Sequence, residues 1–214
     1  MKFVKITAVT LALSFLPVIV NAETEDKAIA ALQSQWTTSN FQLEGKAQEE
    51  ALKELIETAN QALSAHPKSA KLHSLRGIIQ LRYAGIDGGM GALKHVKAAR
   101  ADFEKSINLD AKAQDGTAHA WLGVLYSRVP GWPISFGSDK KAKKHFEKAL
   151  RISPAGRDTN YLYGDYLTTQ KRFKEAEKYI LKALQTKPNP NRPIAETARR
   201  EEIKKALLAA RKNQ

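Results

Sequence analysis

The sequence predicts an all-α protein that is built from stacked pairs of helices. Three observations carry this prediction. Apolar residues recur at helical spacing through most of the chain, whereas alternating strand patterns are hard to find. Several of the apolar runs end shortly before a proline, which stops a helix. The runs and their prolines have matching offsets, and such an internal repeat decides the choice of fold.

The start of the chain, residues 1–22, is typical of an export signal. Lys2 and Lys5 are followed by an apolar stretch of about 15 residues. Val20-Asn21-Ala22 then places small side chains at the positions that a signal peptidase reads. An uncleaved anchor helix is the alternative, but a spanning helix needs about 20 apolar residues. We therefore expect cleavage, export to the periplasm and a mature chain that begins near Glu23.

Composition narrows the function classes. The 214 residues include no cysteine, which excludes a disulfide scaffold, thiolate metal sites, thiol catalysis and a lipidated cysteine. We therefore expect a protein that is not a lipoprotein. Lys and Arg total 35 against 22 Asp and Glu, so the formal net charge is +13. This balance favours an anionic neighbour such as the envelope surface, while an exported protein is not expected to meet nucleic acid.

Four helical units follow one another after the leader. In three of them a small residue lies five positions before a proline, at Pro67, Pro154 and Pro188. Glycine follows two of these prolines by ten positions. The residues that carry the units are, in order, Leu55, Ala59, Ala62 and Pro67; Gly77, Ala99, Phe103 and Ser106; Leu122, Gly123, Tyr126, Ala142, Phe146, Ala149 and Pro154; and Gly164, Ala176, Ile180, Ala183 and Pro188.

This pattern resembles the tetratricopeptide repeat (TPR), a helix–turn–helix unit of about 34 residues. The clearest copy runs from about Arg157 to Pro190, and the resemblance extends from about Glu49. Small residues let the two helices of a unit approach closely, and the large apolar residue fills the space beside them. The resemblance implies TPR-like pairs, within residues 23–193, that stack as a short right-handed solenoid. Residues 194–214 are expected to form a C-terminal capping helix.

Two insertions depart from the repeat. The first, residues 85–91, contains four glycines and is expected to be a long turn, with a ligand lid as the alternative. The second runs from Arg128 to Asp139 and contains two prolines, with Trp132 between them and Phe136 after them. Its aromatics either plug the interior of the array or line a pocket or a partner surface.

TPR proteins typically bind through a concave face that is lined by the first helix of each pair. The groove positions of the family fall on mixed, modestly polar side chains here. Together with the second insertion, they give the candidate binding residues Lys71, Arg82, Arg128, Trp132, Phe136, Asp158, Tyr161 and Asp165.

We expect no enzymatic activity, because no paired acid–base or nucleophile set emerges. Ser138-x-x-Lys141 matches one box of the penicillin-binding enzymes, but the other boxes are absent, so Ser138 is expected to cap a helix. The five histidines show no paired ligand spacing, and we expect no metal or cofactor.

Two functions are left open. The first is a periplasmic TPR scaffold that binds a protein or peptide through its concave face and its aromatic insertion. The second follows from a looser resemblance, in length and aromatic inserts, to the T-components of TRAP transporters. That resemblance implies an accessory protein whose cavity accepts a small ligand beside a substrate-binding protein.

Overall fold

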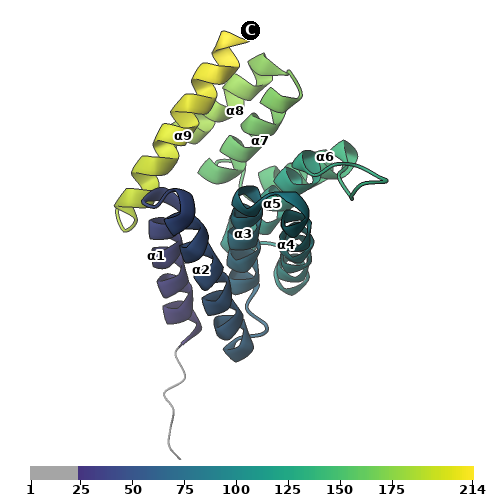
Figure 1. Ribbon diagram of the computed structural model, residues 1–214. Coiled ribbons are helices and arrows are strands. Elements are labelled where there is room, and N and C mark those ends of the chain that lie inside the picture. Colours follow the sequence, from purple (N-terminus) through teal and green to yellow (C-terminus); the bar gives the residue numbers. More distant parts are fainter. Residues whose placement is uncertain (1–23) are drawn as a thin grey trace, which may run out of the picture.

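The structure is a computed structural model that describes residues 24–214. The predicted signal peptide, residues 1–22, lies outside the described residues. Within the described part, the chain forms nine helices and no sheet (Figure 1). The helices are α1 (Glu25–Phe41), α2 (Gly45–Ala65), α3 (Ala70–Asp87), α4 (Gly89–Leu109), α5 (Ala113–Arg128), α6 (Asp139–Ile152), α7 (Arg157–Thr169), α8 (Phe173–Gln185) and α9 (Pro193–Lys212).

Consecutive helices pack as pairs, and the predicted TPR-like all-α fold is confirmed. The closest pairs are α3 with α4, α5 with α6, and α7 with α8. On the N-terminal side α2 packs against both α1 and α3, and on the C-terminal side α9 packs against α8. The buried side chains form a large cluster over α4–α9 and a smaller one over α1–α3. Ile78 packs against both clusters and so joins them.

The small-to-large pairing that the repeat predicts is present in all three clear units. In each, a glycine on the first helix faces a large apolar side chain on the second, and that side chain is fully buried. A Cβ atom added to the glycine would come far too close to its partner: 2.7 Å from Phe103 at Gly77, 2.8 Å from Phe146 at Gly123 and 2.6 Å from Ile180 at Gly164. The glycines are therefore required by the close approach of the helices.

The glycine-rich insertion at residues 85–91 does not form the long turn that was expected. Helix α3 continues to Asp87 and α4 begins at Gly89, so only Gly88 separates them, with a φ of +65°. The extra residues lengthen the two helices because their apolar sides stay packed. Tyr83 is buried and lies edge-on to His95 of α4, with 4.8 Å between the ring centroids.

The two ends of the array meet. Helix α1, which was not predicted as a separate helix, contacts α9 as well as α2 and α3. Figure 1 shows the base of α9 beside α1, so the first and last helices face the same side of the molecule. Between residues 24 and 214, every helix is too short or too polar to cross a bilayer.

Candidate functional site

A pocket of about 420 Å³ lies on the side of the array where α1 and α9 meet. Its walls come from α1, from the odd-numbered helices α3, α5 and α7 of the repeats, from α9, and from Val96 of α4 and Val129 just after α5. A second hollow of about 250 Å³ adjoins it, because both are lined by Trp36, Ile78, Trp121 and Arg199. The concave face of the repeats is therefore a partly enclosed pocket rather than an open groove.

Three arginines and two acids carry the charges in the larger pocket. Arg128 on α5 donates to Asp165 on α7 at 2.5 Å. Arg199 on α9 donates to Glu202 at 2.6 Å and lies 3.2 Å from Asp158. Arg82 on α3 differs, because its hydrogen-bond partner is a neutral amide: its Nη2 donates to Oε1 of Gln48 at 3.2 Å. Of these three arginines, Arg82 is the one whose charge is not matched by a carboxylate in the described structure.

Aromatic side chains form the other part of the lining. Trp36 is buried, and Trp121 is half-buried on the facing helix α5. The guanidinium of Arg199 lies over the ring of Tyr161, 5.3 Å from its centroid. Burial raises the pKa of the Tyr161 phenol, and the negative charges of Glu202 and Asp165 raise it further. The phenol therefore stays protonated at neutral pH and can donate a hydrogen bond into the pocket.

The structure brings together five of the eight candidate residues predicted from the sequence. Arg82, Arg128, Tyr161 and Asp165 line the larger pocket, and Asp158 lines the adjoining hollow. Lys71 lies elsewhere, at the exposed start of α3, where its amino group is 3.9 Å from Asp26 of α1. Trp132 and Phe136 are also outside both hollows.

The second insertion leaves the array instead of plugging it. Trp132 is 89% exposed and Ile134 is 75% exposed, so the plug interpretation is wrong for the tip of the loop. The loop is held by its own backbone: the N–H groups of Ile134 and Ser135 donate to the carbonyl of Gly131. Figure 1 shows it projecting beside α6, away from the contact between α1 and α9.

Phe136 forms the base of this loop. Its ring lies edge-on to Tyr126, with 5.9 Å between the centroids, and 4.9 Å below the guanidinium of Arg100. Ser138 then caps α6, because its Oγ accepts a hydrogen bond from the N–H of Lys141 at 3.3 Å. The capping role expected for Ser138 is confirmed, and it explains the serine–lysine spacing without catalysis.

The residues of the larger pocket that sequence reasoning missed include Trp36, Asn40, Trp121, Arg199 and Glu202. Trp121 follows Thr117, which occupies one of the family's groove positions, by four positions and so shares its helix face, a spacing that could have identified it. Arg199 likewise precedes Ile203 of the buried stripe by four positions. Helix α9 was expected only to cap the array, so its polar residues were assigned to the outside.

A buried histidine, His119, and a half-buried one, His145, lie away from the pocket, at the packing of α5 against α6. The Nδ1 atoms of His119 and His145 are 3.0 Å apart, so one ring donates to the other. Burial lowers the pKa of each imidazole to about 4, and neighbouring positive charges contribute. Throughout residues 24–214, no three His, Cys, Asp or Glu side chains gather closely enough to hold a metal ion.

Comparisons with known proteins add a family. The family described as TRAP transporter T-component matches residues 26–200. No curated protein matches the chain in sequence. Among solved structures, the chain is similar to one described as pilF of Pseudomonas aeruginosa. The two share 15% sequence identity over 88% of this chain and 90% of that chain, with a TM-score of 0.35.

Proposed function

The chain belongs to the TRAP transporter T-component family, and from that premise we propose that it is a periplasmic accessory protein of a transport system that binds a small ligand in the larger pocket. The observation that carries the proposal is the enclosure of this pocket by α9 and α1. A volume of about 420 Å³ falls within the usual range for small-molecule sites. An extended peptide would need a groove that is open at both ends.

The lining favours a ligand with one anionic group and an apolar, flat body. Arg128 and Arg199 are already neutralised by carboxylates, so a ligand anion would gain most from Arg82. The Tyr161 hydroxyl offers a second donor, while Trp36 and Trp121 offer apolar faces for the rest of the molecule. Arginine is suited to this role because its planar guanidinium holds a carboxylate or phosphate by two bonds.

The partner would be another component of the same transport system, and a protein scaffold remains the second candidate. Arrays of this kind present their concave surface to partners. Arg128, at the junction between the pocket and the exposed insertion, is 62% exposed on its side chain, so a partner could reach the mouth of the pocket. In either case the predicted signal peptide provides the route to the periplasm.

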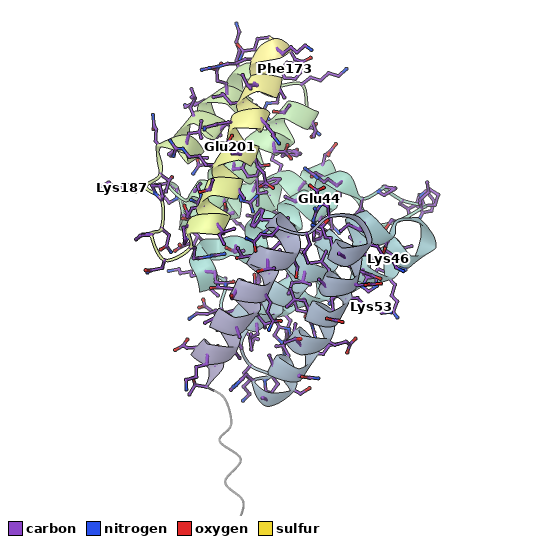
Figure 2. The ribbon with its side chains drawn as sticks, turned by 60° about the vertical axis from the view of Figure 1, so that its left-hand side comes forward. Glu44, Lys46, Lys53, Phe173, Lys187 and Glu201 are labelled. Atoms are coloured by element: carbon purple, nitrogen blue, oxygen red, sulfur yellow. The ribbon has the colours of Figure 1, made fainter. Side chains whose placement is uncertain are left out.

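Native mass spectrometry of the protein isolated from periplasmic extract tests the proposal. We expect a fraction of the protein to carry a small molecule, and Arg82→Met to lose it. Lys187→Met is the matched control, because Lys187 is an exposed cation outside the pocket, in the turn before α9 (Figure 2). If the wild-type protein is bare, and Arg82→Met instead releases a co-purified protein, the scaffold function replaces the ligand function.

A further inference from the structure

The tip of the second insertion is the most exposed apolar surface among the described residues. Trp132 and Ile134, at 89% and 75% exposure, account for two of the four exposed large hydrophobic side chains. The other two, Ile194 and Leu208, are separated from them and from each other along α9. Because Ile134, Ser135 and Gly137 donate backbone hydrogen bonds within the loop, it presents these side chains on a fixed frame.

Positive charge surrounds the base of this loop. The amino group of Lys141 lies 5.3 Å from the ring centroid of Tyr126, and the guanidinium of Arg100 lies over Phe136. Lys140 is exposed beside Lys141 in the first turn of α6. Glu104 pairs with Arg100, and Asp139 begins the helix, so they offset part of this charge. Residues 139–151 still contain six basic against two acidic side chains.

We propose that Trp132 and Ile134 enter the interfacial layer of an anionic phospholipid membrane, with Lys140 and Lys141 on its negatively charged surface. Tryptophan is enriched at this layer because its amphipathic ring suits the headgroup region. Lysine binds the surface of anionic lipids by electrostatic attraction. Membrane binding of this kind requires an apolar tip and positive charge beside it, and both are present at the start of α6.

A membrane fits this surface better than a protein does. A stable protein interface buries about 800 Å² on each partner, with an apolar centre and a polar rim. The insertion offers two large side chains on a projecting tip rather than a face of that size (Figure 1). A lipid layer accepts a narrow convex tip because it has no fixed shape to match.

Vesicle binding by the exported protein tests the proposal. The intact mass of each variant establishes its N-terminus, so that only variants with the same N-terminus are compared. We expect co-sedimentation with vesicles of phosphatidylglycerol and phosphatidylethanolamine, and weak binding to phosphatidylcholine. Replacing both Trp132→Ser and Ile134→Ser should lower the partition at least about tenfold. Ile194→Ser with Leu208→Ser is the matched control and should leave it unchanged, because these side chains are exposed on α9.

Two further measurements separate the insertion of Trp132 from the electrostatic contribution of the lysines. Vesicles with brominated acyl chains should quench the emission of the wild-type protein but not of Trp132→Phe, in which Trp36 and Trp121 remain. Lys140→Gln with Lys141→Gln should weaken binding, and Lys204→Gln with Lys205→Gln on α9 should not. Equal quenching in Trp132→Phe, or equal binding to the anionic vesicles and to the phosphatidylcholine vesicles, would overturn the proposal. So would a loop variant that dissociates an oligomer while vesicle binding persists, since the tip would then contact a second copy.

Discussion

The repeat pairs and the insertion between α5 and α6 use aromatic side chains in opposite ways. Phe103 and Phe146 are fully buried, each against a glycine of the partner helix. Trp132, in the insertion, is 89% exposed. An aromatic side chain is therefore buried or exposed according to the element that faces it. In a repeat the facing residue is set by the register of two helices, whereas in the insertion no second element lies opposite the tip.

The largest effect is expected from Asp102, which joins the first clear pair of helices. Its carboxylate is buried and accepts from Arg76 at 2.7 and 2.8 Å and from Gln80 at 3.1 Å, and it lies 2.9 Å from His73. Asp102→Ala leaves these donors without their acceptor and should lower the free energy of unfolding by about 3–5 kcal/mol. Urea denaturation measures this. Asp102→Asn keeps part of the hydrogen bonding and should cost less.

A smaller loss is expected where the close approach of helices is broken. In Gly164→Ala the new methyl group would lie 2.6 Å from Cγ1 of Ile180 and 3.2 Å from the backbone oxygen of Ala176. The clash should cost about 1–3 kcal/mol of unfolding free energy, because the backbone cannot move aside. Gly85→Ala is the matched control on α3, with no atom within 4 Å of its new Cβ. It should stabilise the protein by about 0.5–1 kcal/mol, and equal effects of the two changes would refute the packing argument.

The pH dependence of stability tests the histidine pair that lies between α5 and α6. Folded His119 and His145 have a pKa of about 4, below the ordinary value of 6.5. As the pH is lowered from 6.5 to 4, the unfolded chain therefore binds protons that the folded chain does not. The free energy of unfolding falls with the pH over this interval. Above pH 6.5 this contribution is complete. Thermal unfolding in steps of pH should show the decline, and His119→Gln with His145→Gln should flatten it.

The smallest effect is expected at the tip of the insertion. Trp132→Ser removes a side chain that is 89% exposed, so the free energy of unfolding should change by no more than about 0.5 kcal/mol. Chemical denaturation beside the Gly164→Ala variant would show the contrast directly. A loss above about 2 kcal/mol would mean that the tip packs against the array after all.

The sequence predicts the repeats well and the closed pocket poorly, for a physical reason. Gly77, Gly123 and Gly164 stand out because each repeats the same local packing, so a spacing is enough to identify them. The pocket depends on α1 and α9 meeting, which is a contact between the two ends of the chain. No local pattern encodes this contact, and for this reason Trp36 and Glu202 were missed although Arg82 and Tyr161 were found.

The conformations of the two insertions also could not be predicted from local sequence patterns. Residues 85–91 contain four glycines, which favour a turn, yet the packing of Tyr83 against α4 keeps most of them helical. The proline-rich second insertion did permit two interpretations of its aromatics. In the structure the two aromatics of this loop behave differently, because Phe136 packs on Tyr126 while Trp132 extends into solvent.

Binding of 8-anilinonaphthalene-1-sulfonate tests whether the larger pocket holds a ligand, because this probe joins one anionic group to flat aromatic rings. The titration uses the Trp132→Ser variant, whose remaining tryptophans, Trp36 and Trp121, both line the pocket. We predict saturable binding at one site, energy transfer from these tryptophans, and at least about tenfold weaker binding when Arg82→Met is added, but not when Lys187→Met is added. Affinity unchanged by Arg82→Met, or binding that does not saturate, would contradict the account.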